Sequence, residues 1–216
     1  MNRKPAALLS LFLALWGCAE GGSRGSGIST AVLGNVVQVQ TDEPRAAADA
    51  VAGAGTDLQG INVVIEGSGI HGQTDANGNF SLSGDFEGMI NLVFELPDGH
   101  WRAHIALNVP AAGKLTLNNV VIDTQTEAAS AETQAVDFDA IITAVNCPGL
   151  ALAVVSAQHG PDDVDDYTLR LDTSSVRDAA GQPVPCADLR SGDRAWVQGY
   201  VDPDGTFGEA EITLEN

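Results

Sequence analysis

The sequence predicts an all-β protein in two domains, a sandwich followed by a small five-stranded barrel. Residues 30–123 consist of short runs of alternating apolar and polar side chains separated by turn residues, a pattern typical of a β-sandwich. Residues 137–216 repeat the pattern in five further runs, which favours a small Greek-key barrel. A leader in residues 1–17 and a Gly/Ser-rich stretch in residues 18–29 precede both domains.

The leader is typical of a signal peptide. Arg3 and Lys4 give it a positive start, and residues 6–16 are almost purely apolar. This run is shorter than the roughly 20 residues that a membrane-spanning helix needs, so it fits the apolar region of a cleaved export signal. Removal of the leader changes the formal charge of −19 to about −21. A surface this acidic repels phosphate backbones, which excludes nucleic acid as a partner.

The leader ends in Leu15-Trp16-Gly17-Cys18, which resembles the lipobox of bacterial lipoproteins. The resemblance implies cleavage before Cys18 and a lipid anchor on its sulfur, although Trp16 departs from the usual small spacer. The alternative is an ordinary signal peptide with a chance cysteine. In such lipoproteins an Asp after the cysteine signals retention in the inner membrane, so Ala19 favours the outer membrane. The expected location is the cell envelope, on the periplasmic or the surface-exposed side of the outer membrane.

Residues 18–29 predict a flexible tether because they are rich in Gly and Ser. An acylated Cys18 at the start of this tether would be held stably, since two or more acyl chains anchor a protein to a membrane. The membrane, reached through the lipid, is therefore the first expected partner.

Three rows of apolar side chains define strands of the first domain, because side chains two apart share one face of a strand. The rows are Ile61, Val63 and Ile65; Ile90, Leu92, Phe94 and Leu96; and Trp101, Ala103, Ile105, Leu107 and Val109. Asn77-Gly78 predicts a two-residue hairpin turn. The apolar alternation of residues 115–117 changes phase by residue 120, so a bulge is expected at Asn118-Asn119.

Two segments of this domain, Gly60–Gly67 and Thr74–Leu82, resemble the carboxypeptidase regulatory-like domains. The similarity extends from about Val32 to Ile122. It implies a seven-stranded sandwich of the transthyretin type that serves as an accessory module for folding, spacing or binding, without an activity of its own. The Ala-rich residues 41–58 depart from the family by lengthening the loop after the first strand.

A polar stretch, residues 124–136, separates the domains and shows no strand alternation, which predicts a linker or a short helix. The strand-like runs of the second domain lie around residues 138–142, 150–154, 167–171, 194–201 and 207–214. Five strands with a corner before the fourth predict a barrel of the OB type. The segments 188–193, 197–199, 204–206 and 210–212 are similar to an uncharacterised OB-like barrel domain common in bacterial lipoproteins. That family implies no established activity.

Apart from Cys18, which would carry the lipid, two cysteines remain, Cys147 and Cys186. In an exported protein an even pair predicts a disulfide. The pair makes a poor metal site because no histidine lies near it in the sequence.

Candidate metal ligands are few. An acidic loop contains four carboxylates, those of Asp162, Asp163, Asp165 and Asp166. They form either a weak calcium site or, as we prefer, a solvated loop whose like charges repel. His100 and His104 would share one strand face roughly 13 Å apart, too far to hold one zinc ion. Residues 75–79 lack the spacing of a calcium-binding loop and are interpreted as a turn.

The sequence shows no catalytic constellation and implies no cofactor. His159 is not accompanied by a nucleophilic Ser or Cys motif. Gly67-Ser68-Gly69 lacks the strand–turn–helix context of a nucleophile elbow. The protein is therefore predicted not to be an enzyme.

The most unusual row of side chains lies on the strand of residues 194–201. Arg194, Trp196, Gln198 and Tyr200 occupy one face, opposite an apolar face. Aromatic side chains on a polar face are suited to stack against a sugar or a peptide. The alternative, which we prefer from sequence, is that the first domain or the linker covers them.

These observations favour a non-enzymatic lipoprotein of the cell envelope, a membrane-tethered binding or structural module whose further partner is an unknown envelope protein. The second hypothesis is a glycan-binding surface lipoprotein that uses Trp196 and Tyr200.

Overall fold

The structure, a computed structural model, describes residues 29–40, 58–99, 101–172, 174–201 and 207–215. Regular structure in these ranges is strand apart from one 3-10 helix, which confirms the all-β prediction. The leader, Cys18 with the rest of residues 18–28, residues 41–57 of the Ala-rich stretch, His100 and residues 202–206 lie outside the described residues. No helix in the described ranges has the length and apolar character needed to cross a bilayer.

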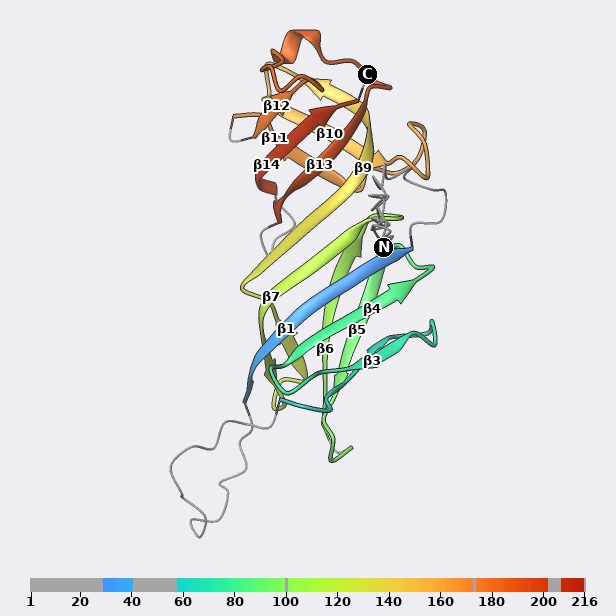
Figure 1. The fold of residues 1–216 in the computed structure, drawn as a ribbon, viewed down its shortest axis with the longest axis vertical. Helices are drawn as coiled ribbons and strands as arrows, with labels where there is room; N and C mark the ends of the chain where they lie inside the picture. Colours follow the sequence, from blue (N-terminus) through green and yellow to red (C-terminus); the bar gives the residue numbers. More distant parts are fainter. Residues whose placement is uncertain (1–28, 41–57, 100, 173, 202–206, 216) are drawn as a thin grey trace, which may run out of the picture.

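The strands belong to one mixed sheet. The first half contains β1 (Thr30–Gln40), β2 (Asn62–Ile65), β3 (His71–Gln73), β4 (Asn79–Gly84), β5 (Gly88–Glu95), β6 (Arg102–Val109), β7 (Lys114–Asp123) and β8 (Ala128–Ser130). The second half contains β9 (Thr133–Asn146), β10 (Ala151–Ser156), β11 (Tyr167–Arg170), β12 (Ser175–Arg177), the 3-10 helix η1 (Cys186–Asp188), β13 (Arg194–Val201) and β14 (Phe207–Leu214). Figure 1 shows the two halves end to end, with β9 running between them.

Two groups of strands enclose the core of the first half. β1 lies between β4, to which it is antiparallel, and β7, to which it is parallel. An antiparallel series runs through β3, β2, β5 and β6, and β8 bridges β6 and β7. In Figure 1 the strands β1 and β4 cross in front of β5 and β6. The rings of Phe80 on β4 and Phe94 on β5 meet edge to face, with centroids 5.6 Å apart.

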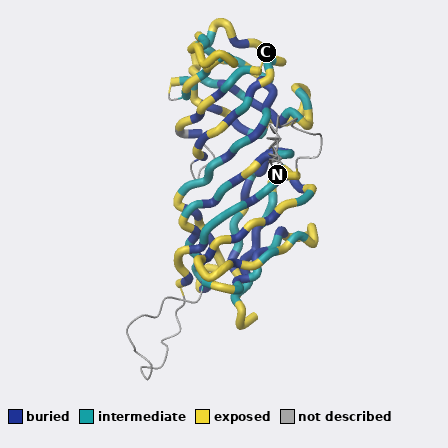
Figure 2. Tube along the Cα trace, viewed as in Figure 1, coloured by how far each residue is buried: buried dark blue, intermediate teal, exposed yellow. Residues whose placement is uncertain are grey.

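Most residues of the predicted apolar rows are buried in this core, and Figure 2 shows buried stretches along the strands of this half. The buried members are Ile61, Val63, Ile65, Leu92, Phe94, Ala103, Leu107 and Val109. Trp101, which precedes β6, is 37% exposed, and the remaining members, Ile90, Leu96 and Ile105, are half-buried. Alternation therefore identified the inward face of β2, β5 and β6 correctly.

The predicted bulge is confirmed. The pairing of β1 with β7 passes from Gly34–Leu117 to Val36–Val120, so β7 contains an extra residue relative to β1. Asn119 takes a left-handed backbone conformation, with φ of 52°. The extra residue changes which face the following side chains occupy, so both Leu117 and Val120 are buried.

The predicted Asn77-Gly78 hairpin is wrong, because β3 pairs with β2 and β4 pairs with β1. The chain instead turns a corner from one group of strands to the other. Asp75 holds this corner: its carboxylate accepts the backbone N–H groups of Asn77 and Asn79 at 2.8 and 2.9 Å. These hydrogen bonds lower the pKa of Asp75, that from Asn79 most. The turn interpretation of residues 75–79 is therefore confirmed.

The predicted linker or short helix at residues 124–136 is also wrong. This stretch contains β8 and the start of β9. β8 pairs with β7 and β6, and Ala129 and Ala131 are buried there. β9 then pairs with β7 through its first residues and with β13 further along. Packing against neighbouring strands outweighs the weak strand preference of this Ala- and Glu-rich composition.

In the second half the strand pairings return to their starting point. β9 pairs with β10, β10 with β11, β11 with β14, β14 with β13, and β13 with β9. The link between β11 and β14 is narrow and consists of the parallel pair Leu169–Phe207. The ring of Tyr167 lies between those of Phe138 and Phe207, with centroid distances of 5.7 and 5.4 Å. β12 adds a short parallel pairing to β14.

The predicted disulfide is confirmed. Cys147, which follows β9, is bonded to Cys186, the first residue of η1, with the two Cα atoms 5.7 Å apart. The bond therefore fastens the long connection between β12 and β13 to the end of β9.

Candidate functional site

The unusual row on β13 has the orientation that alternation predicts. Ala195, Val197 and Val201 are buried, and the opposite face carries the side chains of Arg194, Trp196, Gln198 and Tyr200. Tyr200 is 56% exposed. The interpretation that another part of the chain covers this face is therefore wrong for Tyr200.

Trp196 has a different environment from Tyr200. Its indole Nε1–H donates a hydrogen bond of 2.6 Å to Oδ1 of Asp137 on β9. The side chain is half-buried and lines a recess together with Ala31 and Ala112 of the first half. Trp196 is thus held in place by the sheet and its surroundings, whereas Tyr200 presents its ring to solvent.

Strand register places side chains from five strands in one line beside this row. Lys114 on β7 pairs with Asp137 on β9, which pairs with Gln198 on β13. Gln198 pairs with Glu211 on β14, and Glu211 pairs with Ser175 on β12. Directly paired residues of neighbouring strands point to the same face, so these side chains form a continuous row across the sheet.

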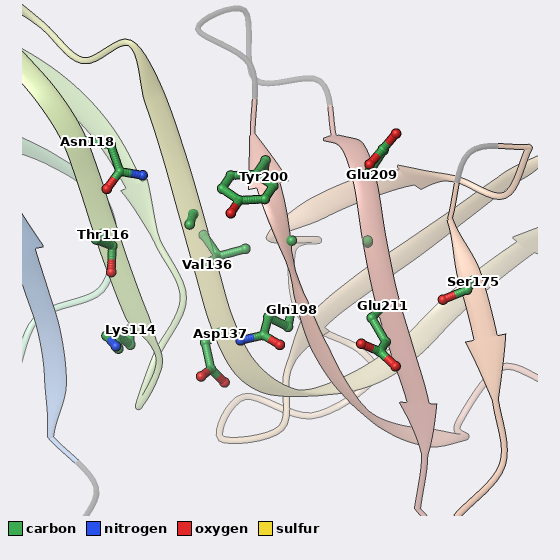
Figure 3. Close-up of a pocket in the computed structure, with 13 residues that line it drawn as sticks. Lys114, Thr116, Asn118, Val136, Asp137, Ser175, Gln198, Tyr200, Glu209 and Glu211 are labelled. Atoms are coloured by element: carbon green, nitrogen blue, oxygen red, sulfur yellow. The ribbon is translucent and has the colours of Figure 1, made fainter. Parts of the chain in front are cut away.

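A second row runs parallel to the first, two residues further along the strands. It consists of Thr116, Ala135, Tyr200 and Glu209. The small side chain of Ala135 leaves a hollow between its larger neighbours. The two rows together line a groove of about 670 Å³ at the junction of the two halves, which we term the junction groove. Figure 3 shows Tyr200 above the groove, with Lys114 and Glu211 on opposite sides.

The junction groove presents hydrogen-bonding groups of both kinds. Lys114 supplies an ammonium donor, Glu209 and Glu211 supply carboxylate acceptors, and Gln198 supplies both. Within the described part of the chain, the side chains of these four residues are not engaged by another side chain. Their polar groups are therefore available to a ligand.

The sequence found half of this site. Gln198 and Tyr200 stand out because they alternate with apolar residues on one strand. Lys114, Glu209 and Glu211 were missed, since each is unremarkable within its own strand. The signal that joins them is the register between β7, β9, β13 and β14. No pattern within a single strand reveals it.

The acidic loop does not gather its four carboxylates around one point. Asp165 accepts a short hydrogen bond from the hydroxyl of Thr143, and Asp166 accepts the backbone N–H of Ser156 at 2.5 Å. Among the described residues, no three His, Cys, Asp or Glu side chains lie together as metal ligands would. His104 contacts the side-chain amide of Asn91 at 3.4 Å.

The loop does join the two halves of the molecule. The backbone carbonyl of Asp166 accepts a hydrogen bond of 2.7 Å from the amide of Asn108 on β6. His159 forms an ion pair of 2.9 Å with Glu87, which precedes β5. Burial raises the pKa of Asp166 to about 6, although the bond from Ser156 opposes the shift. The hydrogen bond to Glu87 raises the pKa of His159.

Replacing Asp166 by Asn is expected to change the pH dependence of stability. The folded protein holds the proton of Asp166 up to about pH 6, whereas the unfolded carboxyl releases it near 3.8. The contribution of Asp166 to the free energy of unfolding is therefore complete below about pH 4 and is lost as the pH rises to 6. The loss is about 1–2 kcal/mol after allowance for solvent screening. Asn stays neutral at every pH. The free energy of unfolding of Asp166→Asn should therefore rise by that amount relative to wild type between pH 4 and 7.

The measurement is urea unfolding across that pH range. Asp162→Asn, at an exposed position of the same loop, is the matched control and should run parallel to wild type. A constant difference between Asp166→Asn and wild type from pH 4 to 7 would contradict the expectation.

No protein-family model matches this chain, and no curated protein matches it in sequence.

Proposed function

We propose that this chain is a non-enzymatic lipoprotein of the cell envelope, a membrane-tethered module that binds its ligand in the junction groove. The observation that carries the proposal is the exposed ring of Tyr200 above a groove of about 670 Å³, in which the side chains of Lys114, Gln198, Glu209 and Glu211 are not engaged by other described side chains. Binding sites characteristically combine such a hollow with a few converging polar groups. The groove is lined by residues of both halves, so in this proposal β9 forms the ligand site by holding the two halves together.

The proposal divides the chain into two domains along the line that the sequence predicts. Two facing groups of strands, with Phe80 against Phe94 between them, support a sandwich like that of the carboxypeptidase regulatory-like domains in the first half. The circuit of β9, β10, β11, β14 and β13 supports a five-stranded OB-type barrel in the second. β9 pairs with β7 of the first domain and with β13 of the second, so one sheet continues from one domain into the other.

A lipid on Cys18 is the proposed attachment to the outer membrane. Replacing Cys18 by Ser should abolish metabolic labelling with a fatty acid and release the protein from membranes, because no acyl chain remains to be buried in the bilayer. Fractionation of cells that produce each form measures both effects. The Cys147→Ser/Cys186→Ser double variant is the control and should keep its label. Persistent labelling of Cys18→Ser would refute the anchor.

Glycan binding is a second candidate, favoured by the exposure of Tyr200. An exposed aromatic ring can stack on the apolar face of a sugar while the surrounding amide and carboxylate groups bind its hydroxyls. A crosslinking pull-down from native envelopes, analysed by mass spectrometry, separates the candidates. A dominant protein crosslinked to the groove supports a protein partner, and a co-purifying glycan supports the second candidate.

Replacing Tyr200 by Ala is expected to weaken ligand retention by about 1–3 kcal/mol, the scale known for aromatic stacking on nucleic-acid bases. The free energy of unfolding should change by no more than about 0.5 kcal/mol, as is usual for exposed positions. Retention in the pull-down and thermal unfolding measure the two effects. Trp101→Ala removes an exposed aromatic outside the groove and should retain the ligand. If Tyr200→Ala and wild type retain the ligand equally, the groove is not the ligand-binding site.

A further inference from the structure

We propose that the junction groove selects uncharged oligosaccharides and rejects acidic ones, with Glu209 and Glu211 as the residues that set this specificity. The inference rests on the glycan candidate above and narrows it to one class of sugar. Three observations support it: the backbone groups of the strands under the groove are already paired, the side chains in the groove both donate and accept hydrogen bonds, and the negative charges lie on one side.

Side chains supply the hydrogen-bonding groups on three of the strands that line the groove. β7 is paired on both sides where it borders the groove, by β1 and β9. β9 is paired by β7 and β13, and β13 by β9 and β14. An extended peptide usually binds a sheet by adding to an unpaired edge, and these strands offer none at the groove. On these three strands a ligand therefore gains its hydrogen bonds from side-chain groups. β14 is paired with β13 on one side and, from Glu211 onward, with β12 on the other.

The available side chains match a ligand that is rich in hydroxyl groups. A hydroxyl both donates and accepts hydrogen bonds, so it can satisfy the carboxylates of Glu209 and Glu211 as well as the ammonium group of Lys114. The amide of Gln198 lies between them in the row and can do both. The exposed ring of Tyr200 completes the set with an apolar surface for C–H groups.

The charges of the groove are unevenly placed. Glu209 and Glu211 are two residues apart on β14, so their carboxylates stand on one face roughly 7 Å apart. Lys114 lies three strand positions away, at about 14 Å across the sheet. Asp137, its neighbour on β9, lies between it and the β14 side. Lys114 therefore does not compensate the two glutamates, and the β14 side of the groove is negative.

A negative surface at this position discriminates between sugars. A uronate or phosphate about 4 Å from one glutamate loses roughly fivefold in affinity even when the pair is fully solvated. The formal charge of −19 on the whole chain adds a long-range repulsion. A neutral sugar meets no such penalty, and its hydroxyls form charge-assisted hydrogen bonds with the same carboxylates.

The test measures the affinity of the mature protein for defined oligosaccharides of equal length by calorimetry. Neutral probes are glucan, mannan, galactan and N-acetylglucosamine hexamers, the acidic probe is a galacturonate hexamer, and a lysine hexapeptide represents a basic peptide. Wild type should bind at least one neutral hexamer and not the galacturonate. Glu209→Gln/Glu211→Gln should bind the neutral hexamer about tenfold more weakly, because it loses two charged acceptors, and should gain measurable affinity for galacturonate.

The control is Asp85→Asn/Asp162→Asn, which removes the same charge from exposed positions outside the groove and should behave as wild type. Equal binding of neutral and acidic hexamers by wild type, or an unchanged preference in the glutamate variant, overturns the inference and leaves glycan binding intact. Failure of every sugar to bind overturns both. Binding of the lysine peptide alone identifies the groove as a site for basic peptides and likewise overturns the inference.

Discussion

Removal of the Cys147–Cys186 disulfide is expected to lower the free energy of unfolding by about 4 kcal/mol. The bond closes a segment with a sequence separation of 39, which contains β10, β11 and β12. Most of that effect comes from the unfolded chain, which regains the conformational freedom that the crosslink removes. In the folded protein, η1 would also lose its covalent link to the end of β9.

Urea unfolding of the Cys147→Ala/Cys186→Ala double variant measures this effect. Wild type unfolded in the presence of a reductant is the control and should match the double variant, because both lack the crosslink. A difference of less than about 1 kcal/mol between oxidised wild type and the double variant would contradict the expectation. The packing of the second half would then suffice without the bond.

Truncation of Phe207 to Ala is expected to cost about 3–5 kcal/mol. The side chain is fully buried, its ring meets that of Tyr167 edge to face, and among the described residues it forms the pair with Leu169 that joins β11 to β14. Removing the ring leaves a cavity at the point where the circuit of strands closes. The loss should therefore appear both in global stability and in local opening of β11.

Urea unfolding and amide hydrogen exchange measure the two effects. Phe207→Leu is the matched control, since a smaller change of volume should cost less than about 1.5 kcal/mol. Equal stabilities of Phe207→Ala and Phe207→Leu would show that the pairing of Leu169 with Phe207 does not hold the circuit together. Unchanged exchange in β11 would place the loss elsewhere in the second half.

Local pattern predicted the strands well because one buried face imposes alternation on each of them. Ile61, Val63 and Ile65 point inward for this reason. The phase change before Val120 revealed the bulge for the same reason, since a register shift must move a side chain to the other face. The disulfide was predicted from the expectation of export and from the pair of cysteines left when Cys18 is set aside, without any knowledge of the fold.

Features that depend on residues far apart in the sequence could not be predicted from local patterns. β8 has a composition typical of a linker, and it forms a strand because β6 and β7 offer it partners. The Asn77-Gly78 turn joins strands that pair elsewhere, and no local signal tells a corner from a hairpin. Only part of the groove was predicted, for the same reason. Tyr200 could be identified because it alternates with apolar residues on its own strand, whereas Glu211 lies in the groove only because of the register of β14 with β13.

The position of β1 has a mechanical consequence for an anchored protein. Any pull from the membrane would enter the fold at Thr30, where β1 begins with β4 on one side and β7 on the other. Ala31 pairs with Lys114, and Lys114 pairs with Asp137 in the groove, so tension on a captured ligand crosses only two strands. Because these residues lie side by side, that tension would act across β1, β7 and β9 and not along β1. The pairs near Thr30, and not the full length of β1, would therefore bear the load.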